Sequence, residues 1–143
     1  MNPIVGDISQ ARPEDHAAIV SICRGHRALS AFGHIMFSGP AAYERGWIRV
    51  FRIGSVIVGF TCVRHKVREP ETSLYYIGVQ DGMRGHRIGE QLIEDVKRQS
   101  PHRRMTLSVL ADNAGARKFY ARLGFSEAGP ALGGKGVKLK LEW

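Results

Sequence analysis

The sequence predicts an α/β or α+β protein in which helices cover the faces of a central sheet. Two observations support this fold class. Stretches with strand-like composition come first along the 143 residues, and a strand–helix–strand–helix–strand succession follows them. From residue 75 onward the pattern then changes from aromatic and β-branched residues, through Gly82 and Gly85, to apolar residues four apart from Ile88 onward.

The N-terminal part reads as a strand, a helix and a segment of mixed pattern. Residues 4–8 suit a strand. Pro13 at a first helical position, followed by two acidic residues, begins a helix that we expect to end at Gly25. In residues 26–46, apolar residues are interrupted by glycines and a proline, which predicts one or two short helices.

The middle of the chain reads as three strands. Residues 47–53 and 56–64 lie on either side of Gly54-Ser55, a two-residue turn of the Gly-X kind, so they predict a hairpin. A loop containing Pro70 leads to the third strand, over residues 73–79.

The C-terminal part alternates helices and strands. Ile88, Leu92 and Val96 lie four apart and predict a helix that runs to about Gln99, before Ser100-Pro101. Further elements are expected in the order strand, helix and strand: 105–110, 113–123 and 137–143.

Composition indicates one globular domain over residues 1–143. The chain is long enough to bury a core, and 43% hydrophobic residues argue against disorder. No apolar run approaches the roughly 20 residues of a membrane span, and the N-terminus does not resemble a secretion signal. With only Cys23 and Cys62, far apart and in apolar contexts, we expect two reduced, buried thiols and a cytoplasmic location. The six histidines lack metal-ligand spacing, so no metal is expected.

The formal net charge of +8 is the strongest compositional signal. A basic protein attracts anions such as coenzyme A, an acidic substrate or nucleic acid, and repels a polycationic acceptor such as a polyamine. Basic stretches are also common on ordinary solvated surfaces, so charge alone names no partner.

Residues 75–89 predict an anion site. A helix that begins after a glycine-bearing turn directs unpaired N–H groups and the positive end of its dipole at whatever lies in front of it, which suits a phosphate. Arg84, His86 and Arg87 add donors and positive charge, and a diphosphate is the expected ligand. The turn matches neither the P-loop nor the G-x-G-x-x-G dinucleotide pattern. Taken alone, it could equally be an ordinary strand–turn–helix with surface arginines.

A family resemblance favours the ligand site. The turn, Arg84-Gly85-His86-Arg87-Ile88-Gly89, resembles the R/Q-x-x-G-x-G/A signature of the GNAT superfamily of acyl-CoA-dependent N-acyltransferases, and Gly78-Val79 precede it as in that family. Residues 113–125 are similar to the family's N-x-x-A-x-x-x-Y-x-x-x-G-F element, and residues 11–15 resemble its first helix entry. The resemblance implies a mixed sheet of about six or seven strands flanked by about four helices.

The resemblance also implies acetyl-CoA as cofactor and assigns residues to it. Those expected to bind the cofactor are Ile77, Gly78, Val79, Arg84, Gly85, His86, Arg87, Ile88, Gly89 and Asn113. The family splays two adjacent parallel strands, so the edge of the Ile77 strand can pair with pantetheine, and Gly78 would permit close approach. From the residues alone, Gly78 could instead be a packing glycine and Asn113 an ordinary N-cap.

Tyr120 matches the family tyrosine that lies near the coenzyme sulfur. A phenol with a pKa of about 10 can protonate a thiolate whose conjugate acid has a pKa near 8.5. The resemblance therefore makes Tyr120 the expected catalytic acid, while core packing is the other interpretation.

One departure from the family signature concerns Arg87, where the family usually has glycine. A side chain there is costly if φ is positive and tolerated if the residue is helical.

The sequence does not single out the residue that acts as general base. Many family members carry a carboxylate on the strand before the signature, and Leu74–Val79 contains none. Glu69 and Glu71 precede that strand, and Tyr76, His34 and His65 are further candidates, as is a water relay.

Three functions are compatible with these residues. The leading one is an N-acetyltransferase that moves an acetyl or short acyl group from acetyl-CoA to an amine of an unidentified acceptor. The first alternative is modification of nucleic-acid bases, as in the Mom-like phage proteins of this fold. The second is a non-catalytic, basic nucleic-acid-binding module with a vestigial coenzyme cleft. We expect no membrane partner, and either a monomer or a homodimer paired through residues 135–143.

Overall fold

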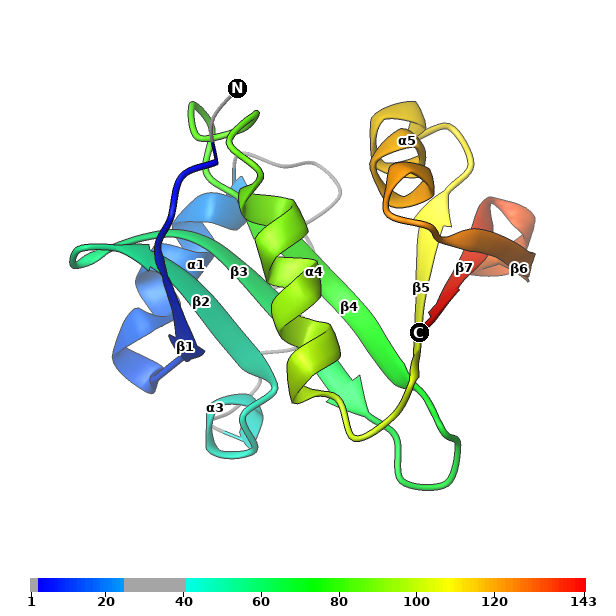
Figure 1. The fold of residues 1–143 in the computed structure, drawn as a ribbon, viewed down its shortest axis with the longest axis horizontal. Coiled ribbons are helices and arrows are strands. Elements are labelled where there is room, and N and C mark those ends of the chain that lie inside the picture. The colour runs from blue at the N-terminus through cyan, green and yellow to red at the C-terminus, as the bar shows by residue number, and fades with distance from the viewer. Residues whose placement is uncertain (1–2, 25–40) are drawn as a thin grey trace. The chain divides into compact units, whose positions relative to one another are not determined.

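The computed structural model describes residues 3–24 and 41–143 and divides the chain into two compact units. Unit 1 consists of residues 1–63 and 76–98, and unit 2 of residues 64–75 and 99–143. Seven strands form a mixed sheet in the order β1-β2-β3-β4-β5-β7-β6 (Figure 1). With its accompanying helices this confirms the expected α/β fold. The single domain over 1–143 stays a prediction.

Unit 1 is a sheet with helices on both faces. Its elements are β1 (Asp7–Gln10), a 3-10 turn (Pro13–Asp15), α1 (His16–Arg24), α3 (Ala41–Glu44), β2 (Ile48–Ile53), most of β3 (Val56–His65), the second half of β4 (Thr72–Val79) and all but the last residue of α4 (Ile88–Gln99). β1 pairs antiparallel with β2, and β2 with β3. Figure 1 shows α1 and α4 on opposite sides of β2 and β3.

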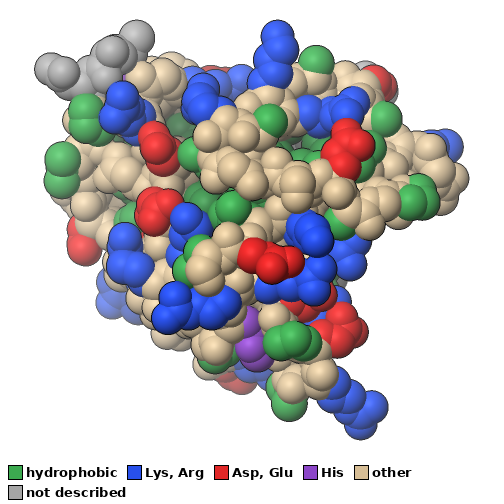
Figure 2. All heavy atoms as spheres, turned by 45° about the vertical axis from the view of Figure 1, so that its right-hand side comes forward, with side chains coloured by type: hydrophobic (Ala, Val, Ile, Leu, Met, Phe, Trp, Pro, Cys, Tyr) green, Lys and Arg blue, Asp and Glu red, His purple; other side chains and the backbone are tan. Residues whose placement is uncertain are grey.

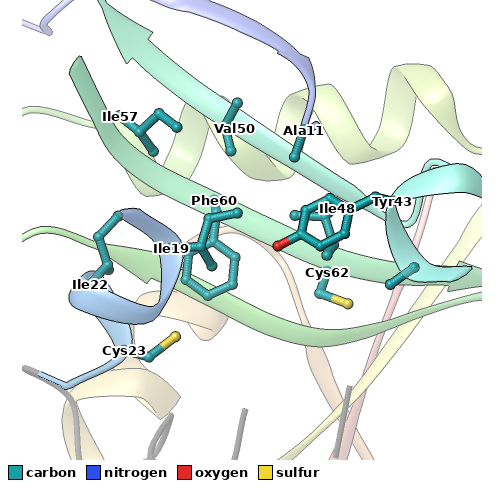
Figure 3. Close-up of a cluster of buried hydrophobic side chains, with 11 residues drawn as sticks. Ala11, Ile19, Ile22, Cys23, Tyr43, Ile48, Val50, Ile57, Phe60 and Cys62 are labelled. Atoms are coloured by element: carbon teal, nitrogen blue, oxygen red, sulfur yellow. The ribbon is translucent and has the colours of Figure 1, made fainter. Parts of the chain in front are cut away.

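One face of this sheet packs against α1 and α3. Buried side chains from these helices, from β2 and β3 and from the segment after β1 form one cluster: Ala11, Ile19, Ile22, Cys23, Ala42, Tyr43, Ile48, Val50, Ile57, Phe60 and Cys62. Figure 3 shows the side chains of α1 facing those of β2 and β3. Both cysteines are free and buried, as expected. Burial raises the pKa of the Cys23 thiol to about 11 and that of Cys62 to about 12. The thiols therefore act as small apolar groups.

The other face packs against α4 through a bulge in β3. Phe51 lies opposite Gly59 and Arg52 opposite Ile57, so Val58 is the extra residue. Val58 joins Phe51, Ile88 and Leu92 in a second core. A Cβ on Gly59 would lie 3.2 Å from both Ile88 Cγ2 and Leu92 Cδ1. A glycine here lets α4 approach the strand closely.

A buried ion pair fixes α4 to the sheet. Arg49 on β2 donates from Nε to Asp95 Oδ2 (2.6 Å) and from Nη2 to Asp95 Oδ1 (3.1 Å). The Asp95 side chain is only 4% exposed and that of Arg49 18%. This two-point geometry is the strong form of a carboxylate–guanidinium pair. A second pair, Arg52 with Asp15 at 2.6 Å, ties β2 to the turn that precedes α1.

Unit 2 contains the C-terminal strands and one helix. Its elements are β5 (Arg104–Leu110), α5 (Ala114–Arg122), β6 (Ser126–Ala131), a 3-10 turn (Leu132–Gly134) and β7 (Gly136–Glu142). β7 pairs antiparallel with both β5 and β6. The start of β4 pairs in parallel with β5, Thr72 with Met105 and Ser73 with Thr106. Opposing residues of β5 and β7 are alternately apolar and polar, as a half-buried sheet requires.

The structure corrects two expectations and leaves one outside its range. The strand expected at 4–8 lies at Asp7–Gln10, and the sequence reading missed β6, whose residues are almost all exposed and include Gly129 and Pro130. Apolar alternation is absent there, so periodicity carried no signal. The helix end at Gly25 and residues 26–40 lie outside the described residues, while α3 is a short helix within the expected 26–46. In the described part of the chain, no helix is long and apolar enough to cross a membrane.

Replacing Asp95 with alanine should destabilise the protein strongly. Asp95→Ala leaves the Arg49 guanidinium largely buried without its carboxylate, which costs about 3 kcal/mol of unfolding free energy. The neighbouring Glu94→Ala removes an exposed pair with Lys97 and should cost less than about 1 kcal/mol. Urea unfolding of the two variants measures the difference, and equal losses would contradict the structural role given to Asp95.

Candidate active site

The turn between β4 and α4 has an unusual backbone. Gly82 and Gly85 have φ values of 87° and 84°, in the left-handed region that glycine accepts without strain. Arg87 also has a left-handed φ, of 59°. Of the two alternatives for this position, positive φ is the one observed, which explains why the family signature usually has glycine there. The arginine side chain is exposed, and its backbone is strained.

The turn ends at a helix start that suits an anion. α4 begins at Ile88, and the Arg87 carbonyl accepts the first helical bond, from Gln91 N at 3.1 Å. The preceding N–H groups of this first turn, those of Ile88, Gly89 and Glu90, have no partner within the helix. Arg84 is exposed and pairs with Asp81 at 3.3 Å.

His86 contributes a buried, unsatisfied atom to the same turn. Its Nδ1 is buried and has no hydrogen-bond partner among the described residues. A buried polar atom without a partner is costly unless a ligand or water satisfies it. This atom, the glycine-bearing turn and the first-turn amides, which lack partners within the helix, fit a phosphate-bearing coenzyme.

The end of β4 supplies the rest of the expected coenzyme residues on unit 1. Ile77 and Val79 are partly buried and pack on the core beneath α4. Gly78 is buried, and Tyr76 packs on the opposite core, beside α1. The strand alternates as period two requires, and its end leads directly into the turn.

Asn113 and Tyr120 lie on one helix of unit 2. Asn113 is the N-cap of α5, and its Oδ1 accepts a hydrogen bond from Ala116 N at 3.2 Å. Tyr120 is 7% exposed and makes edge contacts with Phe119 and Phe125, with ring centroids 5.2 and 5.3 Å away. Burial raises the Tyr120 pKa above its ordinary value, so the phenol keeps its proton. Packing and a proton-donor role are thus compatible in the same side chain.

The candidate bases on unit 2 belong to a polar network. Glu71, 6% exposed, accepts hydrogen bonds from Thr106 Oγ1 (2.6 Å) and Lys66 Nζ (3.3 Å). Burial raises the Glu71 pKa, but these hydrogen bonds and the charges of Lys66 and Lys138 outweigh it, and the net shift is downward. A carboxylate held ionised in this way is a weak base. Exposed Glu69 also pairs with Lys66, at 3.3 Å.

The remaining candidates differ in protonation. His65 is hydrogen-bonded to Thr72 (2.7 Å), and burial together with nearby His102 lowers its pKa, so it is neutral near pH 7. Burial raises the pKa of Tyr76, which keeps that phenol protonated. His34 lies outside the described residues. Sequence reasoning did not find the Lys66–Glu71–Thr106 contacts, because no local pattern pairs these segments.

The comparisons with known proteins name the family. The profile of the Acetyltransferase (GNAT) family matches residues 12–125. The chain belongs to the GNAT acetyltransferase family. A curated relative, the 5-NmdU N-acetyltransferase of Pseudomonas phage PaMx11, is 44% identical to this acetyltransferase over 137 residues, which are 95% of this chain and 98% of the relative.

Solved structures share the fold of the acetyltransferase. A GNAT acetyltransferase from Bacillus cereus has a TM-score of 0.79 at 18% identity, covering 97% of this chain and 98% of its own. The PaiA N-acetyltransferase of Thermoplasma acidophilum, solved with coenzyme A, has a TM-score of 0.75 at 14% identity, covering 98% and 100%. At these identities the likeness concerns the fold alone.

Family membership confirms the expected chemistry in its general form. The protein is an acetyl-CoA-dependent N-acetyltransferase, with acetyl-CoA and an amine as its two substrates. It is therefore an enzyme, and the reading as a non-catalytic binding module is not supported. The individual roles expected for Tyr120, Asn113 and the β4 and turn residues stay predictions.

Replacing Arg87 with glycine should stabilise the acetyltransferase. Arg87→Gly removes the steric cost of the left-handed conformation, a gain of about 1 kcal/mol after the greater chain entropy of glycine is included. The same change at Arg98, in the right-handed last turn of α4, should instead cost about 1 kcal/mol. Thermal and urea unfolding give both values. A destabilised Arg87→Gly protein would show that Arg87 makes compensating contacts.

Proposed function

We propose that this acetyltransferase acetylates an amine nitrogen on a modified DNA base, 5-NmdU or a base closely related to it. The observation that carries the proposal is the 44% identity to a 5-NmdU N-acetyltransferase across almost the full length of both chains. This relationship favours modification of a nucleic-acid base over acetylation of an amine on some other, unidentified acceptor. A phage-type DNA modification is thus the function the relationship best supports.

The distribution of charge supports a nucleic-acid substrate. Unit 2 contains eleven Lys and Arg against five Asp and Glu, whereas unit 1 contains ten against eight. Unit 2 therefore carries six of the eight net positive charges. Figure 2 shows many Lys and Arg side chains on the face turned forward, with fewer Asp and Glu. Cations concentrated in this way attract the phosphates of DNA.

Each group of candidate residues has a separate role in the proposed acetyl transfer. Acetyl-CoA supplies the acetyl group as a thioester, whose C–S bond breaks as the new N–C bond of the amide forms. The first-turn amides of α4, with Arg84 and Arg87, would hold its phosphates, and the edge of β4 at Ile77–Val79 its pantetheine. Tyr120 Oη would hold the proton that the departing sulfur takes up. The acceptor amine reacts in its neutral form and loses one proton to solvent or to a base.

The buried network around Glu71 has a structural role in this proposal. Its carboxylate is ionised and already accepts two hydrogen bonds, so it neutralises Lys66 and fixes the start of β4 against β5. Removing a proton from the acceptor would require breaking these bonds. We therefore assign no proton transfer to Glu71.

The acceptor is tested directly with DNA. Purified enzyme and acetyl-CoA should add one acetyl group to an oligonucleotide duplex that contains 5-NmdU, and none to the matched duplex with thymidine, as mass spectrometry reports. The rate on the duplex should fall steeply with added salt, while the rate on the free 5-NmdU nucleoside should change little. Acetylation of peptide or small-molecule amines without any transfer to the modified duplex would overturn the proposal.

The role of Tyr120 is tested by removing its hydroxyl group. Tyr120→Phe should lower kcat by about tenfold or more and leave the Kd for acetyl-CoA within about twofold. Tyr75→Phe removes a hydroxyl from an exposed tyrosine and should change neither value. Because burial raises the Tyr120 pKa, the wild-type rate should show no descending limb below about pH 10. An unchanged kcat in Tyr120→Phe would assign the residue to packing.

A further inference from the structure

The side chain of Gln91 joins the N-terminal segment to the turn between β4 and α4. Its Nε2 donates to the Ile4 carbonyl at 2.8 Å and to the Arg87 carbonyl at 3.2 Å. Gln91 lies in the first turn of α4, and Ile4 is 87 residues away in sequence. One amide group therefore connects two segments that no local pattern relates.

The N-terminal segment also bonds to the turn itself. Ile4 N donates to the His86 carbonyl at 3.1 Å, and Gln91 N donates to the Arg87 carbonyl at 3.1 Å. Two consecutive carbonyls of the turn are thus held, the first by Ile4 and the second by both nitrogens of Gln91. Each bond lies within unit 1.

These bonds act at the strained residue. Arg87 has a φ of 59°, and a non-glycine residue in this conformation relaxes toward negative φ unless its surroundings prevent it. Rotation about the Arg87 backbone would redirect the His86 carbonyl and the amides that follow it. Holding the carbonyls on both sides of the Arg87 Cα prevents that rotation.

We propose that Gln91, together with the backbone of Ile4, is a positioning device that keeps the Arg87 turn in its coenzyme-binding conformation. The family signature usually has a glycine at this position, which needs no such support. This chain has Arg87 there, together with the hydrogen bonds from Gln91 and Ile4, which we call the clamp. The inference rests on the proposed role of residues 84–89 in binding the coenzyme, and it is independent of the acceptor. Gln91 touches no reacting atom in this arrangement.

Calorimetric titration with coenzyme A, which needs no turnover, tests the clamp. Gln91→Met keeps the length of the side chain and removes its donor, and should raise the Kd for coenzyme A by about tenfold. In steady state, KM for acetyl-CoA should rise similarly while kcat and the acceptor KM stay unchanged. Gln99→Met, at the exposed far end of α4, is the matched control and should change none of these.

The Gln91→Met change is also made in the Arg87→Gly protein, to distinguish an effect on the turn from a general effect on the stability of α4. In Arg87→Gly protein the turn needs no clamp, so Gln91→Met should raise the Kd by less than about threefold relative to Arg87→Gly alone. The same tenfold penalty in both backgrounds would overturn the proposal, as would an unchanged Kd in folded Gln91→Met. If Gln91→Met does not fold, Ile4→Pro removes the N-terminal donor to His86 and should give the same pattern.

Arg84→Ala distinguishes failure of the clamp from failure of the coenzyme site. If Arg84→Ala weakens coenzyme A binding and Gln91→Met does not, the turn binds the coenzyme and the clamp is wrong. If neither variant affects binding, residues 84–89 are not the coenzyme site, and both proposals fall.

Discussion

The two-point ion pair between Arg49 and Asp95 is the contact on which the position of α4 in unit 1 depends. It fixes helix α4 to β2 at a buried position, while Ile88 and Leu92 pack closely over Gly59. The first turn of the same helix presents the amides of Ile88, Gly89 and Glu90, which have no partner within the helix. A helix held by charge and by close apolar packing cannot rock without separating a buried pair. The direction of those amides is therefore set by contacts beneath the helix as well as by the turn.

In unit 2, buried polar side chains connect strand segments through hydrogen bonds. Thr72 Oγ1 bonds to both His65 and Ser100, at 2.7 Å in each case, while Glu71 binds Lys66 and Thr106. These side chains come from the end of β3, the start of β4 and the approach to β5. They link the segments near the points where the chain passes from one unit to the other. Glu71 and His65, two of the groups that the sequence offered as bases, make hydrogen bonds to neighbouring segments in the folded chain.

The parts of the fold that sequence predicted well are those with a strong local period. The helix at 88–99 was predicted with its observed bounds, because apolar residues four apart end at Ser100-Pro101. β6 was missed because its exposed residues carry no alternation. The signature motif located the glycine-bearing turn between β4 and α4, but the conformation of Arg87 needed coordinates, since arginine suits a helix as well as a strained turn. The contact between Gln91 and Ile4 joins distant segments, and no periodicity encodes it.

The two buried thiols have a practical consequence for chemical labelling. With pKa values of about 11 and 12, about one cysteine in ten thousand or fewer is ionised at neutral pH, and maleimides and iodoacetamides react with the ionised form. Cys23 and Cys62 in the native chain should therefore react very slowly with these reagents. A cysteine introduced at an exposed position, such as Lys118→Cys on α5, would react selectively without removal of Cys23 or Cys62. Fluorophores can therefore be attached to unit 2 while both native cysteines stay in the packed core.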